Sequence, residues 1–411
     1  MSFAISPTRS IFLLTLTLSF ASANAQHNHA TTAPDHGAKA AGDWQQEEAS
    51  NLREPLQLTP DSRFFKAGEA YFSPDDSKII FQAVENPEGD GPADEFYAMF
   101  VADIARDGKG NIQGLKNIKR ISPLGSANTC GWFHPTDPNI VLFSSTIGPP
   151  TESHPPGYQR ATGRYRWMFP PEMSIVQADL RTANGTKDTL KTLIQTGHYA
   201  AESSLSKDGR HLLYCSLESG QGDLYVKDLK TNTTRAIVKS HGYDGGPFFS
   251  PDGQRICFRS DRNGNNLLQL FVADLEFDET GAIIGIKREY QLTDNVQVNW
   301  CPYWTPDGRH LIYGTSEISH RNYEVFLIDA DPGNLPGSPG PLKYGTRKRR
   351  ITFGPGADIL PVISNSGRLM MWTGQRGASK MSQLWVAELI MDLDPKIDMS
   401  GYDPSQHKKS H

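Results

Sequence analysis

Residues 242–275 read GYDGGPFFSPDGQRICFRSDRNGNNLLQLFVADL. Two apolar segments flank the tetrapeptide Ser250-Pro251-Asp252-Gly253, and a third apolar segment ends in Asp274. Proline presets φ at the second turn position, aspartate hydrogen-bonds its own backbone, and glycine accepts positive φ, so this tetrapeptide is typical of a tight turn. The segment therefore predicts a β-hairpin followed by a third strand.

The same unit recurs along the chain. Its hairpin copies are, in order, YFSPDDSKIIF, WFHPTDPNIVLF, SLSKDGRHLLY, FFSPDGQRICF, YWTPDGRHLIY and VISNSGRLMMW. The equivalent turn positions are Pro74, Pro135, Lys207, Pro251, Pro306 and Asn365, which gives spacings of 61, 72, 44, 55 and 59 residues. Such spacings are typical of propeller blades with insertions. We predict an all-β fold, a six-bladed β-propeller.

The sixth copy lacks a fourth strand. Nothing suitable follows its third strand at Leu389, whereas NLREPLQLT, residues Asn51–Thr59, has the pattern of the fourth strand KREYQLT and precedes the first inner strand. We predict that this N-terminal segment is the outer strand of blade six and closes the ring, which removes exposed sheet edges. The propeller then covers residues 51–391, and residues 392–411 form a C-terminal tail.

The first 25 residues have the features of a signal peptide. Arg9 precedes an apolar run from Ile11 to Phe20, and the small residues Ala23-Asn24-Ala25 follow. The run is shorter than the roughly 20 residues that span a membrane. We therefore expect cleavage before Gln26, a periplasmic or secreted protein without a membrane span, and a disordered leader at residues 26–50, which has few large apolar residues.

Charge and cysteine content exclude some classes of protein. The chain has 41 Lys and Arg against 46 Asp and Glu, so it lacks the basic excess of a nucleic-acid-binding protein. Export permits disulfides. However, the four cysteines, Cys130, Cys215, Cys257 and Cys301, lie in different repeats among apolar residues, so we expect them to be free and buried.

The segment Gly242–Leu275 resembles the WD40-like repeat of TolB-like six-bladed β-propellers, and weaker copies cover most of residues 51–389. The resemblance implies a bacterial exported protein whose propeller is mainly a platform for protein or ligand contacts, as in the Tol-Pal system of the cell envelope. TolB proteins carry a separate α/β domain before the propeller. Here only about 25 residues separate the predicted cleavage site from the first strand, so the chain is more similar to stand-alone exported relatives than to TolB itself.

Binding is expected on one face of the ring. Because strands alternate in direction, the loops between strands two and three lie on the same face as the loops that enter the next blade, opposite the tight turns. Binding residues tend to lie on such variable loops. Around the channel on this face we expect Glu69, Asn128, Cys130, Tyr199, Glu202, Tyr243, Asp244, Asn299, Trp300 and Asp358. These polar groups could bind a cation or a polar ligand, or satisfy loop backbone groups and channel water.

A second candidate is the loop of blade two, from Ser144 to Met173, the longest insertion. Its aromatic and arginine residues are of the types that carry most interface energy, namely Arg160, Arg164, Tyr165, Arg166 and Trp167. The neighbouring loop Glu85–Glu95 is acidic. The two loops could pair with each other and form a packed lid, or the arginines could contact a partner.

Catalytic motifs are scarce. The sequence has no GxSxG elbow, HExxH pair, CxxC set or phosphate-binding Gly-rich loop. We therefore predict non-catalytic binding, without a cofactor, of a protein, peptide or glycan of the cell envelope. The alternative is a glycan-active enzyme similar to propeller lyases of the oligogalacturonate type, with a metal near His198, His241 and His320, although their spacing forms no ligand motif. The sequence leaves the partner, a metal and the oligomeric state open.

Overall fold

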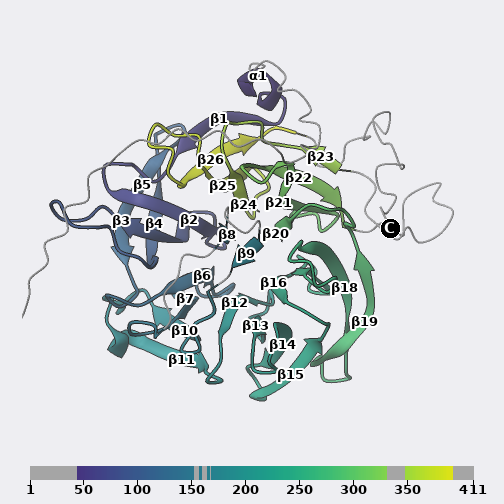
Figure 1. The fold of residues 1–411 in the computed structure, drawn as a ribbon. Coiled ribbons are helices and arrows are strands. Elements are labelled where there is room, and N and C mark those ends of the chain that lie inside the picture. The colour runs from purple at the N-terminus through teal and green to yellow at the C-terminus, as the bar shows by residue number, and fades with distance from the viewer. Residues whose placement is uncertain (1–43, 152–156, 160–163, 167, 331–347, 392–411) are drawn as a thin grey trace, which may run out of the picture. The chain divides into compact units, whose positions relative to one another are not determined.

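The computed structural model describes residues 44–151, 157–159, 164–166, 168–330 and 348–391. Within them, six four-stranded antiparallel sheets follow one another around a central channel (Figure 1). This confirms the predicted all-β, six-bladed propeller. No helix in these ranges is long and apolar enough to cross a membrane.

The first five blades each use four strands in chain order, from the channel outward. Blade one has β2 (Phe64–Phe72), β3 (Lys78–Glu85), β4 (Ala98–Arg106) and β5 (Ile112–Arg120). Blade two has β6 (Asn128–Phe133), β7 (Ile140–Ser145), β10 (Ser174–Asp179) and β11 (Leu190–Ile194), the last preceded by a short 3₁₀ turn at Lys187–Thr189. Blade three has β12 (Ala200–Leu205), β13 (His211–Ser216), β14 (Asp223–Asp228) and β15 (Thr233–Val238).

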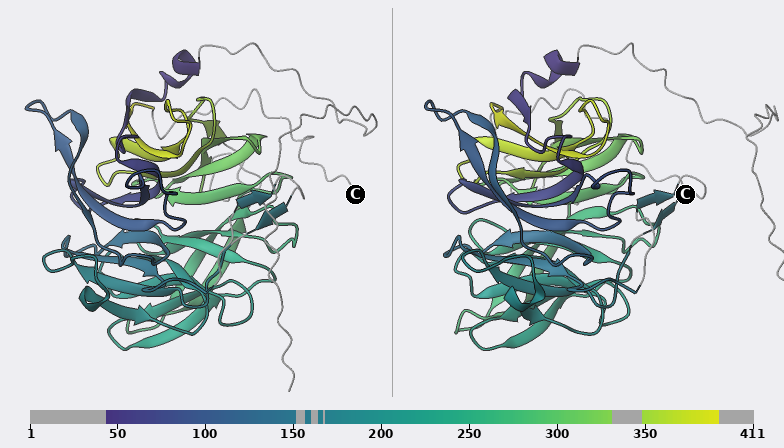
Figure 2. Two further views of the ribbon diagram at one scale, coloured as in Figure 1. Left: turned by 60° about the vertical axis from the view of Figure 1, so that its left-hand side comes forward. Right: turned by 90° about the vertical axis from the view of Figure 1, so that its left-hand side faces the viewer.

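Blades four and five repeat this order. They comprise β16 (Asp244–Phe249), β17 (Arg255–Ser260), β18 (Gln269–Phe277) and β19 (Ile283–Gln291), then β20 (Asn299–Trp304), β21 (His310–Ser319), β22 (Asn322–Asp329) and β23 (Lys348–Arg350). A small hairpin of β8 (Gly157–Gln159) and β9 (Arg164–Arg166) is inserted between β7 and β10. Figure 2 shows this hairpin projecting on one side of the blades.

Blade six closes the ring as predicted. Its sheet has the order β24 (Asp358–Ile363), β25 (Leu369–Gly374), β26 (Gln383–Leu389) and β1 (Leu52–Gln57). The N-terminal strand β1 pairs antiparallel with β26, with Leu52 opposite Leu389. The buried Leu52 side chain also joins the apolar cluster of blades five and six.

The end of the predicted leader is ordered, which corrects our expectation of disorder for residues 44–50. Trp44–Glu48 form the helix α1, beside β1 in Figure 1. Glu48 is buried, and its pair with Arg376, with Oε1 2.6 Å from Nη1, offsets the cost of burying its charge. An ion pair with a residue far along the chain was not visible in the leader's polar composition. The predicted signal peptide and C-terminal tail lie outside the described residues.

The tight turns form as their sequence predicts. In blade four, the Ser250 hydroxyl donates to Asp252 Oδ1 at 2.5 Å, and the Gln254 N–H donates to the same oxygen at 3.0 Å. The Gly253 N–H donates to the Ser250 carbonyl at 2.8 Å, with a φ of 70° at Gly253 that glycine adopts without strain. The turn therefore fixes the register of the two inner strands.

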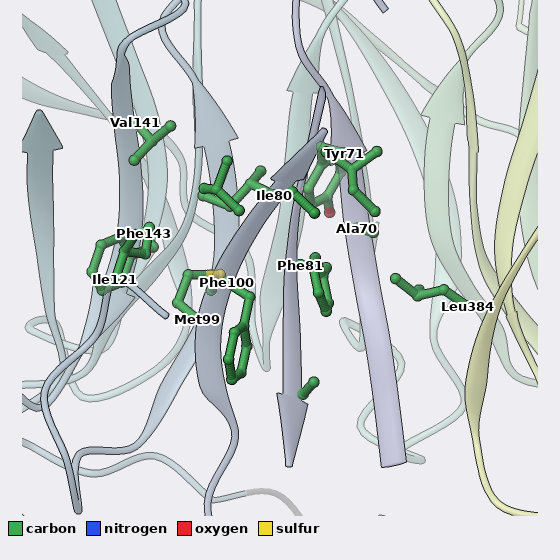
Figure 3. Close-up of a cluster of buried hydrophobic side chains, with 14 of the residues drawn as sticks. Ala70, Tyr71, Ile80, Phe81, Met99, Phe100, Ile121, Val141, Phe143 and Leu384 are labelled. Carbon is green, nitrogen blue, oxygen red and sulfur yellow. The ribbon is translucent and has the colours of Figure 1, made fainter. Parts of the chain in front are cut away.

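Apolar side chains pack between adjacent blades. Figure 3 shows part of the largest cluster, in which Ile80 and Met99 of blade one lie on the side of Val141 and Phe143 of blade two, while Phe81 and Phe100 lie on the other side of the same strands. Gly131 lies at this interface, where a Cβ atom would be 2.6 Å from Ile80 Cγ1. The four cysteines are free and buried, each in a different blade.

Candidate binding pocket at the channel mouth

The inner strand of every blade contains a β-bulge, seen as a shift in its pairing with the second strand. At each bulge one residue has positive φ: Glu69 (37°), Cys130 (54°), Glu202 (58°), Gly246 (58°), Cys301 (49°) and Leu360 (53°). A bulge places two residues opposite one and interrupts the alternation of side chains between the two faces. All six bulge residues line the same cavity at the channel.

The cavity has a volume of about 640 Å³ and an aromatic floor. In four blades the residue two positions after the bulge residue is aromatic. These rings, of Tyr71, Trp132, Phe248 and Tyr303, have centroids 5.2–6.5 Å apart. Tyr71 and Phe248 also line the cavity. Because the rings come from different blades and meet across the channel, the cavity is a pocket with a packed floor.

Further aromatic side chains form the walls. The ring of Phe169 lies 4.9 Å from that of Tyr199 and 5.3 Å from that of Tyr243, while Tyr97 and Trp300 line other sides. Burial raises the pKa of Tyr97 to about 12, and it also raises the pKa of Tyr199 and of Tyr243. These phenols are therefore neutral hydrogen-bonding groups at physiological pH.

One carboxylate in the pocket is neutralised by a buried cation. Glu202 forms an ion pair with Arg259 from β17, and their side chains are 11% and 10% exposed. Glu202 Oε2 also accepts hydrogen bonds from Tyr243 Oη at 2.8 Å and from the Gly246 N–H at 2.7 Å. Arg259 in turn lies over the Tyr243 ring, 5.7 Å from its centroid. The position of Glu202 in blade three is thus fixed by three residues of the neighbouring blade four.

The second carboxylate has neutral partners. Glu69 accepts hydrogen bonds from Tyr71 Oη at 3.0 Å and from Thr129 Oγ1 at 3.1 Å. Burial raises the pKa of Glu69, and the charge of Glu202 raises it further. The two acidic groups on the inner strands are therefore in different environments, Glu202 paired with a cation and Glu69 bonded to hydroxyl groups.

Comparison with known proteins identifies the repeat. Residues 182–336 match the family model described as the TolB β-propeller domain. The chain carries a TolB-like propeller. It is 27% identical to a protein of Agrobacterium fabrum strain C58 over 136 residues, which are 32% of this chain and 43% of that protein. It is 24% identical to the Tol-Pal system protein TolB of Francisella tularensis over 212 residues, 43% of this chain and 48% of TolB.

The chain thus spans less than half the length of these curated relatives. Among solved structures, TolB from Acinetobacter baumannii is similar at 16% identity, with a TM-score of 0.44, over 79% of this chain and 64% of that chain. At this level the likeness concerns the fold alone.

In the TolB-like propeller, six of the nine predicted channel residues line the pocket, together with Cys130: Glu69, Asn128, Tyr199, Glu202, Tyr243 and Trp300. The other three are fully buried inside their blades. Asp244 accepts a hydrogen bond from Ser240 Oγ at 2.6 Å, Asn299 accepts one from Thr315 Oγ1 at 3.0 Å, and Asp358 pairs with Arg376. They lie two residues before the bulge, the position that Asn128 occupies in blade two, and each is held inside its blade by the polar partner named here.

The predicted blade-two loop is described only in part. Arg160 and Trp167 lie outside the described residues, while Arg164, Tyr165 and Arg166 form β9, which pairs with β8. The end of the same loop reaches the pocket, because Met168 and Phe169 line it. Of the acidic blade-one loop, Glu85 pairs with Arg63 at 3.2 Å, and Asp94 and Glu95 line the pocket.

Sequence reasoning missed several pocket residues, above all Arg259, Gln82 and Phe169. A signal for Arg259 was present, since it is a charged residue that directly follows the apolar residues Ile256-Cys257-Phe258 of the second strand. The histidines of the alternative lyase model do not line the pocket, and His198 and His241 are exposed. In the part of the chain that the structure describes, no group of three or more His, Cys, Asp or Glu could hold a metal ion.

Proposed function

We propose that this protein is an exported protein of the cell envelope whose TolB-like propeller binds a peptide segment of a protein partner, without catalysis, in the channel-mouth pocket. The observation that carries the proposal is the pocket itself. Concave sites with aromatic walls and a few fixed polar groups are typical of ligand binding. The match to a Tol-Pal system protein over 43% of the chain supports a protein as the partner.

Exposed apolar residues on the same face favour a partner larger than a small molecule. Leu124, Val296 and Ile318 are 80%, 73% and 45% exposed. Leu124 and Val296 lie in loops that enter the next blade, and Ile318 lies near the turn between β21 and β22, so all three belong to the pocket face. The neighbours of Val296 and Ile318, Asn295 and Glu317, are hydrogen-bonded to each other at 3.3 Å, and adjoining exposed apolar groups are typical of protein interaction surfaces. We include Arg160, Arg164, Tyr165, Arg166 and Trp167 in the proposed surface because their loop leads directly to Met168 and Phe169.

The test is affinity capture from envelope extracts with the purified protein and two variants. Phe169→Ala removes a pocket wall, and we expect it to lose the captured partner. Phe277→Ala is the matched control, because Phe277 is a partly buried phenylalanine at the end of β18, on the opposite face. Capture by the control but not by Phe169→Ala supports the proposal. Equal capture by both variants would refute binding through the pocket.

Export is tested separately by fractionating cells and sequencing the N-terminus of the mature protein. We expect the protein in the periplasm or the medium, with Gln26 as its first residue. A cytoplasmic protein that retains Met1 would refute export but leave peptide binding open.

A further inference from the structure

Among the described residues that line the pocket, acidic side chains outnumber basic ones. The acidic groups are Glu69, Asp94, Glu95 and Glu202, whereas the basic groups are Lys66 and Arg259. Arg259 is committed to Glu202 by a buried ion pair. Lys66 lies over the Tyr97 ring, 4.7 Å from its centroid, and the charges that act on it are those of Asp94 and Glu95. Glu69, by contrast, lies on an inner strand and accepts its hydrogen bonds from the uncharged hydroxyl groups of Tyr71 and Thr129.

Outside the Glu202–Arg259 pair, two buried side chains of the pocket have a polar atom without a hydrogen-bond partner. They are Gln82, which is 8% exposed and whose Oε1 is unsatisfied, and Ser203, which is 3% exposed and whose Oγ is unsatisfied. Gln82 is paired in register with Gly68, the residue before Glu69. A buried acceptor without a donor costs roughly 1–3 kcal/mol. Gln82 Oε1 is an acceptor on the strand paired with that of Glu69, so it points to a ligand that brings a hydrogen-bond donor to this side of the pocket.

The aromatic walls already hold cations. Both basic side chains of the pocket lie against tyrosine rings, Lys66 on Tyr97 and Arg259 on Tyr243. The face of an aromatic ring attracts a cation, more strongly where water is excluded. A further cation that entered between these walls would meet ring faces as well as the Glu69 carboxylate.

We propose that the pocket takes a lysine or arginine side chain of the partner peptide, whose cation pairs with Glu69 and donates to Gln82. This inference rests on the proposed function, since it names the chemistry of the peptide that the pocket recognises. Ammonium and guanidinium groups carry three and five donors and no acceptor, which suits a carboxylate beside an unsatisfied amide oxygen. Hydrogen bonds between charged partners are stronger than those between neutral ones.

The experiment begins with selection of a phage-displayed random heptapeptide library on the purified protein, on Glu69→Gln and on Glu388→Gln. Glu69→Gln keeps the shape and an acceptor for Tyr71 and Thr129 but removes the charge. Glu388→Gln is the matched control, because Glu388 pairs with Arg53 on the outer strand of blade six, away from the pocket. We expect peptides rich in Lys or Arg from the wild type and from Glu388→Gln, and their loss with Glu69→Gln.

The strongest peptide is then synthesised with each basic residue replaced in turn, Arg by citrulline and Lys by norleucine. One replacement should weaken binding to the wild type at least tenfold and binding to Glu69→Gln less than twofold. Enrichment of peptides without basic residues, or of the same basic peptides by Glu69→Gln, would overturn the cation inference and leave peptide binding intact. If no peptide were enriched on the wild type, peptide binding itself would be refuted. The citrulline and norleucine peptides decide the question on the wild type even if Glu69→Gln fails to fold.

Discussion

The tight turns of blades three and five are each followed by an Arg-His pair, Arg210-His211 and Arg309-His310. The pKa values of the two histidines are nevertheless shifted in opposite directions. Burial and the charge of Arg210 lower the pKa of His211. Burial also acts to lower the pKa of His310, but Asp307 and Asp329, 3.7 and 3.4 Å from its two ring nitrogens, raise it to about 9. In blade three, the acid equivalent to Asp329 pairs with Arg210 instead.

The charged His310 should make stability depend on pH. Its pKa in the folded state exceeds the unfolded value near 6.5, so its contribution is complete below about pH 6.5 and is lost as the pH rises through about 9. We expect His310→Gln to lower the free energy of unfolding by roughly 2–3 kcal/mol at pH 6 and by much less at pH 10. Urea unfolding of the wild type and the variant at pH 6 and pH 10 measures this loss of free energy.

The control for this experiment is His211→Gln. Because the folded-state pKa of His211 is lowered, its neutral form contributes stability above the unfolded pKa and loses it as the pH falls. The difference in free energy of unfolding between His211→Gln and the wild type should not become smaller between pH 6 and pH 10. If the free energy of unfolding lost in His310→Gln were the same at both pH values, His310 would be neutral in the folded protein.

Arg376 joins the N-terminal helix to blade six. Its side chain is 2% exposed and pairs with Glu48 and Asp358, which are themselves buried. Arg376→Met leaves these two carboxylates without a cation, so we expect a loss of about 3–5 kcal/mol in the free energy of unfolding, measured in urea. Arg53→Met removes an exposed pair with Glu388 and should cost less than about 1 kcal/mol. Equal losses for both variants would contradict this account.

Strands and turns could be predicted from sequence because each depends on neighbouring residues. The hairpins follow from their turn residues, and β1 follows from its likeness to the other fourth strands. The orientation of the inner-strand residues could not be predicted, because regular alternation puts Asp244 and Gly246 on the same face. The bulge separates them, and its positive φ is found even at Glu69 and Leu360, which are not residue types that favour it. The residues that a bulge turns to the channel therefore became known from the structure.

Close packing between blades one and two depends on a glycine in β6. A Cβ atom at Gly131 would lie 2.6 and 2.7 Å from Ile80 Cγ1 and Cδ1 and 3.1 Å from Met99 Sδ. We expect Gly131→Ala to destabilise the protein by about 1–3 kcal/mol through overpacking, as a lower urea midpoint would show. Gly148→Ala is the matched control, since nothing lies within 4 Å of its added Cβ. A wild-type midpoint for Gly131→Ala would show that Ile80 moves aside at little cost.

At the scale of the molecule, the ring depends on its N-terminal strand. A chain that begins at Leu58 lacks α1 and β1, so it exposes the edge of β26 and leaves Arg376 without Glu48. Exposed edges promote pairing between molecules. We expect self-association by light scattering and a Tm lower by about 10 °C or more. A chain that begins at Asp43 keeps both elements and should behave like the wild type. A monomeric Leu58 chain with an unchanged Tm would contradict this role of β1.

The pairing of β1 with β26 also determines the order in which the blades fold during synthesis of the chain. The partners Arg53 and Glu388 are 335 positions apart, whereas the strands of each other blade are neighbours in the sequence. Local blades can form while synthesis continues, but the earliest strand has no partner until the latest one has emerged. Because distant pairing is slow, we expect ring closure to be the final and rate-limiting step, and nascent chains that stop before Gln383 to remain open.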